Sequence, residues 1–512
     1  MIKKSLKSNL QRKTQEAKRM AALDDLISQI PDESLRERIR AEMKRANRQK
    51  KFGLVFEEHL PEATPLYDIP VKRGSVVAKK DGQVTDIYYV EEIEDGQATC
   101  FHKATKERVV LPVDALACVA QFGEPIYPYL QPLDTVCNAP DSDLWHTLIE
   151  ADNYHALQLL EYLYAGKVDC IYIDPPYNTG ARDWKYNNDY VDGNDTYRHS
   201  KWLSMMEKRL KLAKRLLNPA DSVMIVTIDE KEYLHLGCLL EELFPNARIQ
   251  MVSIANNLAG VQRANEFGRV NEFAFFIMIG EAVPQIIDFF AGSGTTCHAV
   301  NLLNAEDGGH RRCIMVTNNE VSDNEAKALT KRGFKPGDEE WNRLGIARYI
   351  TWPRTVCSLK GYDINGKPIK GDYLTSGEEP MHMADGFKAN AAFFKLGFLD
   401  KNAVALGRQF KELLPVLWLK AGAHGPCPAL EEAVEVPAML VLPVNHFAVL
   451  TDESQYETFA AQVNGEDSIT TVYIVTDSEP GYREMISGLN AEDTYQLYRD
   501  YLDNFRINHG GR

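Results

Sequence analysis

The chain has 512 residues, which at roughly 100–200 residues per domain is enough for two or more domains with buried cores. Hydrophobic residues make up 44% and charged residues 26%, and no apolar run approaches the ~20 residues that span a bilayer, so the composition excludes a membrane class. The formal net charge is −15, yet residues 1–51 hold eight Lys and seven Arg against seven acidic residues, so a local basic patch for nucleic acid is not excluded.

Residues 1–60 are predicted to form a basic helical arm. The segment is rich in Lys, Arg, Glu, Ala and Leu, with a break at Ile30–Glu33 where Asp32 suits a helix cap. Two interpretations stay open: direct contact with DNA, or a solvated pair of charged helices. The polar and basic N-terminus also argues against a secretory signal, so we expect a cytoplasmic protein.

Residues 61–135 are predicted to form a small antiparallel β-barrel. Short β-like runs alternate there with Asp-Gly turns. The runs lie at Ser75–Ala78, Val84–Val90, Thr99–His102 and Val109–Leu111.

Strands and helices alternate from Leu144 onward, which predicts a doubly wound α/β domain over 136–354. We divide it into a catalytic half, 136–280, and a cofactor half, 281–354, and expect a separate α/β region over 355–512. The predicted strands are 167–173, 222–228, 248–253, 273–279, 285–289 and 313–317. The predicted helices are 154–164, 201–217, 230–243 and 295–304.

The strongest chemical signal is Asp174-Pro175-Pro176-Tyr177 at the end of an apolar strand. Open α/β sheets bind ligands at the carboxyl ends of their strands. A carboxylate and a proline carbonyl can each accept one hydrogen of an exocyclic amine, and a tyrosine ring can stack on a flipped base. The motif therefore indicates chemistry on a base amine.

A second signal is the strand that leads through Asp288 and Phe290 into Gly292-Ser293-Gly294 at the start of a helix. Glycines there allow a nucleotide-like cofactor to approach the backbone closely. Glu320 follows the next strand, where an acidic side chain can hold ribose hydroxyls. The structural alternative is a solvated glutamate after a strand.

Three further candidates have structural interpretations. The spacing of Asp229–Glu232 is that of a capping box at a helix start. Arg198 and His199, at a helix entry, suit packing or phosphate contact equally well. His298 has no partner of metal-ligand type nearby, and the nine cysteines form no CxxC pair or Cys/His cluster, so we assign no metal.

Together these motifs resemble those of DNA adenine-N6 methyltransferases that use S-adenosylmethionine, and in particular the modification subunits of type III restriction systems. In the beta class of that family the Asp-Pro-Pro-Tyr motif precedes a Phe-x-Gly-x-Gly motif, which is the order of 174–177 and 290–294 here. Protein-glutamine methyltransferases, with Asn-Pro-Pro-Tyr after the cofactor motif, and cytosine-N4 enzymes, usually with Ser for Asp, fit less well. The resemblance covers about 140–375.

The resemblance implies a Rossmann-like S-adenosylmethionine-dependent methyltransferase sheet, flanked here by the helical arm, the small β-barrel and the C-terminal α/β region. It implies a catalytic or substrate-positioning role for Asp174, Pro175, Pro176, Tyr177 and Asn178. It places around the cofactor Asp288, Phe290, Gly292, Gly294 and Glu320. The implied partner is double-stranded DNA, and a restriction and translocase subunit and a second copy of the chain are further candidates, with no membrane.

One departure from the family concerns the segment after Phe273–Ile279, where members carry a large target recognition domain. Here only Gly280 and Glu281–Pro284 precede the cofactor strand. A specific DNA interface buries on the order of 1,000–2,500 Å², which so short a connection cannot supply. It can still reach about 17 Å, enough for three strand spacings of roughly 14 Å in all.

Two hypotheses follow. The first is a site-specific methyltransferase that transfers the methyl group of S-adenosylmethionine to N6 of a flipped adenine, as in restriction-modification. The second is a truncated, catalytically impaired relative that acts as a DNA-binding or assembly subunit. Binding of S-adenosylmethionine distinguishes them.

Overall fold

The computed structural model describes most of the chain between residues 64 and 497. The described residues are 35–36, 56 and 64–497, except for 68, 83, 85, 121–126, 180, 187–188, 193–194, 196, 256–270, 280–284, 374–379, 400–409 and 432–435. The chain divides into two units, residues 1–55 and residues 56–512. The helical arm predicted over 1–60 thus lies almost wholly outside the described residues and stays a prediction.

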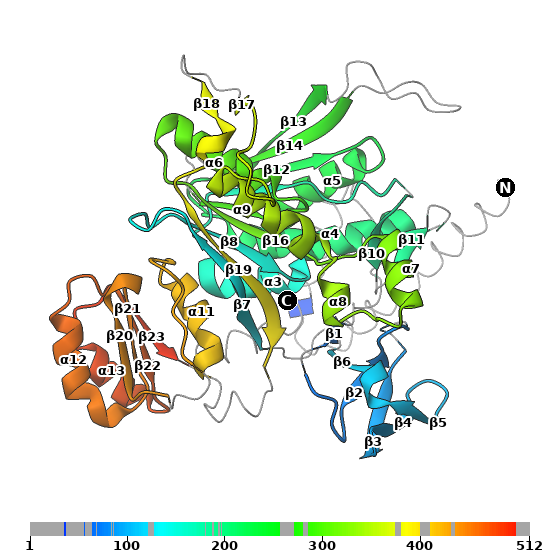
Figure 1. Cartoon of the computed structure of the whole chain (residues 1–512), viewed down its shortest axis with the longest axis horizontal. Helices are drawn as coiled ribbons and strands as arrows, with labels where there is room; N and C mark the ends of the chain where they lie inside the picture. Colours follow the sequence, from blue (N-terminus) through cyan, green and yellow to red (C-terminus); the bar gives the residue numbers. More distant parts are fainter. Residues whose placement is uncertain are drawn as a thin grey trace. The chain divides into compact units, whose positions relative to one another are not determined.

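A nine-stranded sheet is the largest sheet of the second unit (Figure 1). Its strand order is β13-β14-β12-β9-β15-β16-β8-β19-β7. The six strands from β12 to β19 run parallel, whereas β14 is antiparallel to β12 and β13, and β7 is antiparallel to β19. The strands are β7 Pro128–Cys137, β8 Trp145–Glu150, β9 Cys170–Ile173, β12 Ser222–Ile228, β13 Arg248–Ala255, β14 Asn271–Ile279, β15 Gln285–Asp288, β16 Arg312–Thr317 and β19 Asn390–Phe398. The α/β class and the predicted strands from 167 to 317 are confirmed.

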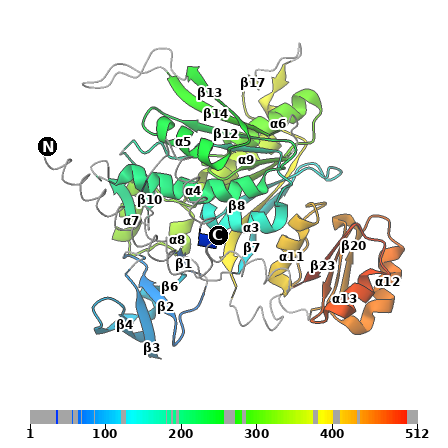
Figure 2. The same ribbon diagram turned by 180° about the vertical axis from the view of Figure 1, so that it is seen from behind.

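Helices cover both faces of this sheet (Figures 1 and 2). On one face α4 contacts both α3 and α5, and on the other α6 contacts α9. The connections β9-α4-β12 and β15-α6-β16 proceed in opposite directions along the sheet, so right-handed crossovers place α4 and α6 on opposite faces. The helices are α3 Asn153–Tyr164, α4 Arg198–Leu216, α5 Tyr233–Leu243, α6 Thr295–Asp307, α7 Asp323–Lys331, α8 Glu339–Asn342, the π-helix η2 Ala347–Thr351 and α9 Trp352–Lys360.

Two of the predicted domain boundaries fall inside elements of this fold. The boundary at 135/136 lies inside β7, an edge strand of the sheet, where prolines such as Pro132 are tolerated. The boundary at 354/355 lies inside α9, since Pro353 occupies the first turn of a helix, where its missing N–H costs nothing. The sheet also takes β19 between β8 and β7. It therefore extends well past the predicted end of the domain.

A separate antiparallel sheet lies toward the N-terminal side, with strand order β1-β6-β2-β3-β4-β5. Its strands are β1 Thr64–Leu66, β2 Val76–Lys79, β3 Tyr88–Glu94, β4 Gln97–His102, β5 Arg108–Pro112 and β6 Leu116–Ala120. They share one apolar core that includes Val77, Val90 and Cys118. β3 begins at Tyr88, later than the predicted Val84. Closure of this sheet into a barrel stays a prediction.

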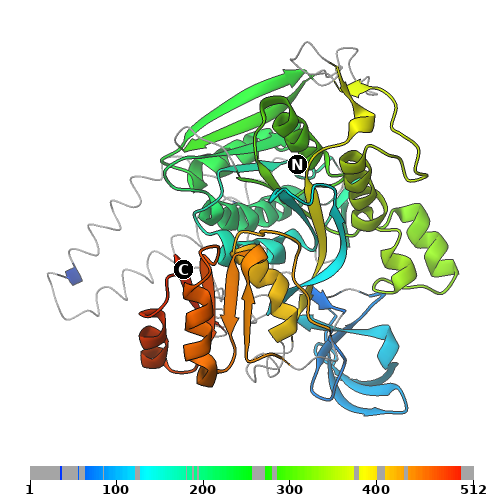
Figure 3. The ribbon, with the colours of Figure 1, turned by 60° about the vertical axis from the view of Figure 1, so that its left-hand side comes forward.

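The C-terminal region contains a third sheet with its own helices (Figure 3). Its strand order is β20-β21-β22-β23, with β20 antiparallel and the others parallel. Side chains of α12 and α13 join those of the strands in one core. The elements are α11 Phe410–Lys420, β20 Met439–Leu442, β21 Phe447–Leu450, α12 Tyr456–Asn464, β22 Thr471–Val475, α13 Glu479–Ile486 and β23 Asp493–Leu497. Two hairpins complete the described strands: β10 Ala181–Tyr186 with β11 Asp189–Asp192, and β17 Asp372–Tyr373 with β18 Met381–His382.

Among the described helices, none has both the length and the apolar character that crossing a bilayer requires.

Candidate active site

The two motifs singled out in the sequence follow neighbouring parallel strands. Residues 174–178 leave the carboxyl end of β9, and residues 289–294 leave the carboxyl end of β15, which pairs with β9. The chain continues from β9 to β12 on one side and from β15 to β16 on the other. This is a switch point of the strand order, where open α/β sheets form a ligand-binding crevice.

Asp174 is exposed at this edge of the sheet and is held by the neighbouring strand β12. The Thr227 hydroxyl, near the end of β12, donates a hydrogen bond of 2.6 Å to Asp174 Oδ1. One carboxylate oxygen is thereby oriented from within the protein. The exposed carboxylate keeps capacity to accept a hydrogen from a ligand.

The two prolines differ in what their carbonyl groups contact. The buried indole of Trp202, on α4, donates a hydrogen bond of 2.7 Å to the Pro176 carbonyl. Among the described residues, none donates to the carbonyl of Pro175. Trp202 thus anchors the loop through one carbonyl and leaves the other as an acceptor.

Tyr177 is half-buried, and its hydroxyl donates a hydrogen bond of 3.3 Å to Glu272 Oε2 at the start of β14. Burial, followed by the negative charges of Asp174 and Glu272, holds the pKa of the Tyr177 hydroxyl well above its ordinary value. The hydroxyl therefore keeps its proton and can act as a hydrogen-bond donor to Glu272.

Asn178 anchors the far end of the loop. It adopts φ +56° and is 1% exposed, and its Nδ2 donates a hydrogen bond of 2.5 Å to Glu232 Oε1. Glu232, fully buried before α5, also contacts His199 Nδ1 at 2.5 Å and His235 Nδ1 at 2.9 Å. Glu232, His199 and His235 thus form a group of side chains of the kind that can hold a metal ion.

The capping-box prediction for Asp229–Glu232 is wrong. The helix begins at Tyr233, and Asp229 Oδ1 accepts from the Lys231 amide in the turn before it. The Glu232 carboxylate faces Asn178 instead of the helix start. Local spacing alone could not distinguish the two, because the acceptor that Asn178 needs lies on another element.

Asp288 organises the glycine turn. Its Oδ1 accepts from the Phe290 amide at 3.0 Å, and its Oδ2 accepts from the Thr296 hydroxyl at 2.5 Å. Asp288 is 2% exposed, and burial, with a smaller contribution from the charge of Asp174, raises its pKa to about 6. Both of its oxygens are thus used to hold the turn that precedes α6.

The two glycines of the turn are required by conformation and space. Gly292 and Gly294 have φ +49° and +80°, a region that side chains rarely adopt. A Cβ on Gly294 would lie 3.1 Å from Thr351 Cγ2. Thr351 in turn donates a hydrogen bond of 2.5 Å to the Gly292 carbonyl. The π-helix η2 therefore contacts the glycine turn and stabilises its conformation through Thr351.

Glu320 lies just beyond β16, the strand next to β15. It is half-buried, its carbonyl accepts from the Ile346 amide at 2.9 Å, and its Oε2 accepts from Asn318 Nδ2 at 3.4 Å. The ends of β9, β15 and β16 thus bring Asp174, Asp288 and Glu320 to one edge of the sheet.

Four residues of the site were not singled out as site residues by sequence reasoning. They are Thr227, Glu272, Trp202 and Glu232. Trp202 lies in the segment His199–Leu203 and Thr227 in the segment Thr227–Glu230, and both segments resemble those of the family. That resemblance is the one signal that could have marked these two residues. Glu272 gives no sequence signal, because its role arises from the antiparallel pairing of β14 with β12.

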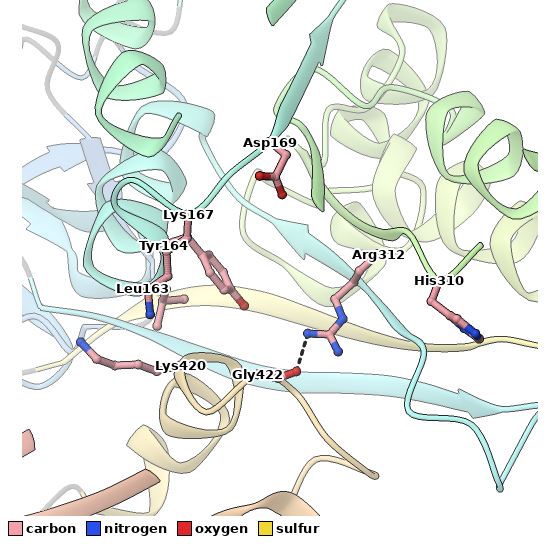
Figure 4. A pocket seen from close by; sticks show the side chains of 8 residues that line it. All are labelled: Leu163, Tyr164, Lys167, Asp169, His310, Arg312, Lys420 and Gly422. Carbon is pink, nitrogen blue, oxygen red and sulfur yellow. Dashed lines mark hydrogen bonds between the residues drawn. The ribbon is translucent and has the colours of Figure 1, made fainter. Parts of the chain in front are cut away.

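The cavity in Figure 4 is distinct from the site formed by the two motifs. It has a volume of about 370 Å³. It is lined by Leu163, Tyr164, Lys167, Asp169, His310, Arg312, Lys420 and Gly422. Asp169 precedes β9 and Arg312 begins β16, so the cavity lies at the amino ends of the parallel strands, opposite the two motifs.

Part of this domain matches a family of known proteins. Residues 168–282 match the family model N6_N4_Mtase, described as DNA methylase. The match includes the Asp174–Tyr177 loop and ends before the glycine turn.

The chain is also similar to several restriction-modification proteins. The chain is 35% identical over 133 residues to the "Probable type III restriction-modification enzyme HindVI Mod subunit" of Haemophilus influenzae, covering 26% of this chain and 17% of that protein. It is 31% identical over 152 residues to the type III restriction-modification enzyme EcoPI Mod subunit of Escherichia phage P1, covering 25% and 23%. The matches thus span about a fifth of these relatives' own lengths.

Among solved structures, the chain is similar to the crystal structure of the M1.HpyAVI–SAM complex. The likeness has a TM-score of 0.24 at 16% identity and covers 36% of this chain and 97% of the other.

Proposed function

We propose that this protein is a DNA methyltransferase that transfers the methyl group of S-adenosylmethionine to N6 of a flipped adenine within a restriction-modification system. One observation carries the proposal: the Asp174–Tyr177 loop and the Gly292–Gly294 turn leave adjacent parallel strands on the two sides of a switch point. An amine-holding loop beside a cofactor turn is the arrangement that methyl transfer to a base needs.

In the proposed reaction the exposed Asp174 carboxylate and the Pro175 carbonyl each accept one hydrogen of the adenine amine. These two hydrogen bonds aim the nitrogen lone pair at the methyl group, and the neutral ring of Tyr177 stacks on the flipped base. The nitrogen–methyl bond forms as the sulfur–methyl bond breaks, and the surplus proton of the amine leaves through Asp174. No covalent enzyme intermediate is required.

S-adenosylmethionine supplies a methyl group on a cationic sulfur. The residues proposed to surround it are Asp288, Phe290, Gly292, Gly294 and Glu320. The acidic groups Asp174 and Glu272 lie at the same edge, and their negative charge suits a cationic ligand. Gly292 and Gly294 carry no Cβ, which allows a ligand to approach the backbone of the turn closely.

Target recognition is proposed to lie outside the β14–β15 connection. The end of β14 lies three strand positions from β15, as predicted, so five residues can join them but cannot form a base-reading surface. The basic N-terminal segment, the C-terminal region, a second copy of the chain or a restriction and translocase subunit are the proposed sources, with action in the cytoplasm on double-stranded DNA.

The test is transfer of labelled methyl groups to unmethylated duplex DNA, with mass spectrometry for N6-methyladenine. We expect activity in the full chain, none in Asp174→Ala, and normal activity in Asp169→Asn, which alters an acid at the opposite end of the same strand. Calorimetry should show that Asp174→Ala still binds S-adenosylmethionine. A methylating Asp174→Ala variant would contradict the assignment.

The alternative function, a catalytically impaired DNA-binding or assembly subunit, draws on the short β14–β15 connection. It predicts DNA binding by the wild-type chain with no measurable affinity for S-adenosylmethionine. The same calorimetric titration therefore decides between the two functions.

A further inference from the structure

We propose that Glu232 is a positioning residue for the methyl transfer, because its buried carboxylate holds the Asp174–Tyr177 loop in its working conformation. The inference rests on the proposed function and names the group that fixes the amine-holding loop of that site. Glu232 does not touch the reacting atoms. It acts through Asn178, the residue that follows the loop.

The contacts of Glu232 form a closed hydrogen-bond network. Its carboxylate is 0% exposed and meets Asn178 Nδ2, His199 Nδ1 and His235 Nδ1 at 2.5, 2.5 and 2.9 Å. A carboxylate can only accept hydrogen bonds, so all three partners donate to it. They come from the loop and from the first turns of α4 and α5, three elements joined at one buried charge.

The network is better explained by hydrogen bonds than by a bound metal ion. Arg198 Nε donates to His199 Nε2 at 3.4 Å, which places the ring proton of His199 on Nδ1, facing Glu232. A metal ligand would need that nitrogen free of its proton. Glu232 also stands at the start of α5, where the helix dipole favours a negative charge.

Asn178 transmits this anchoring to the loop. Its φ of +56° turns the chain directly after Tyr177, and asparagine is one of the few residues besides glycine that adopt this left-handed conformation readily. The bond to Glu232 supplies the constraint on one side of Tyr177. The bond from Trp202 to the Pro176 carbonyl supplies it on the other side. The loop is thus held on both sides of Tyr177, at the Pro176 carbonyl and at Asn178.

The decisive variant is Glu232→Gln, with Glu241→Gln, an exposed change on α5, the helix that follows Glu232, as matched control. Glutamine keeps the shape but turns an amide group toward donors. We expect kcat to fall about 100-fold, as for a small displacement of reacting groups, with an unchanged Kd for S-adenosylmethionine. Hydrogen exchange of residues 171–179 should accelerate. The double variant Glu232→Gln/Asn178→Asp reverses donor and acceptor and should recover part of kcat.

The outcomes separate this inference from the proposed function. A wild-type chain without methylation defeats the proposed function, while hydrogen exchange of the loop still decides whether Glu232 orders it. If Glu232→Gln matches Glu241→Gln in loop exchange and kcat, the positioning role is overturned. It is also overturned if cofactor binding falls together with kcat, or if a chelator abolishes wild-type activity and zinc restores it.

Discussion

Replacing Asp288 by asparagine should remove a pH dependence from the stability of the cofactor strand. The pKa of Asp288 is raised to about 6, mainly by burial. The folded state therefore holds this proton more tightly than the unfolded state, and the folded state loses stability as pH rises. Compared with an ordinary aspartate, the raised pKa of Asp288 destabilises the folded state by about 3 kcal/mol at high pH. This destabilisation is absent below pH ~4 and complete above pH ~7.

The asparagine keeps an oxygen for the Phe290 amide and offers an amide to the Thr296 hydroxyl, so the turn should keep its shape. As the pH rises from ~4 to ~8, the stability of Asp288→Asn relative to wild type should therefore increase by about 3 kcal/mol. The assay is hydrogen exchange of peptides covering 285–304, with both proteins compared at each pH, since a chain of this size does not unfold in one step. Asp174→Asn is the control and should reduce the wild-type dependence only in part. A difference independent of pH would refute the reasoning.

Three further outcomes are expected. Gly294→Ala should weaken S-adenosylmethionine binding at least tenfold by calorimetry, whereas Gly308→Ala, at φ +70° with open space at the other end of α6, should lower the melting temperature and leave the affinity unchanged. Trp202→Phe leaves the Pro176 carbonyl without its donor and should lower kcat about tenfold, which a single-turnover methylation assay measures. Arg348→Met breaks the ion pair with the buried carboxylate of Glu150 at the end of β8 and should destabilise this region by about 3 kcal/mol, measured by hydrogen exchange of peptides covering 145–150 and 347–351; a loss below about 1 kcal/mol would contradict it.

Elements with a strong local pattern were predictable from the sequence. β12 has the predicted bounds, 222–228, because its apolar run is long and bounded by turn residues. Elements whose limits depend on packing were not. The predicted domain end at 354 falls within α9, which begins at Trp352, and β19 enters the large sheet although its sequence stands apart from the α/β pattern that precedes it.

The two motifs proposed to form the site could be found in the sequence, because an apolar strand that ends in Asp174–Tyr177, and another that ends in a glycine turn, are local patterns of residue type and spacing. The three-dimensional structure was needed to find that β9 and β15 are neighbours, that the Thr227 hydroxyl donates to Asp174, and that Asn178 donates to Glu232. These partners lie more than fifty positions from the groups they hold. Local periodicity constrains only which face of an element is buried. Which side chains meet across elements depends on the order of strands and the packing of helices, and those are properties of the whole domain.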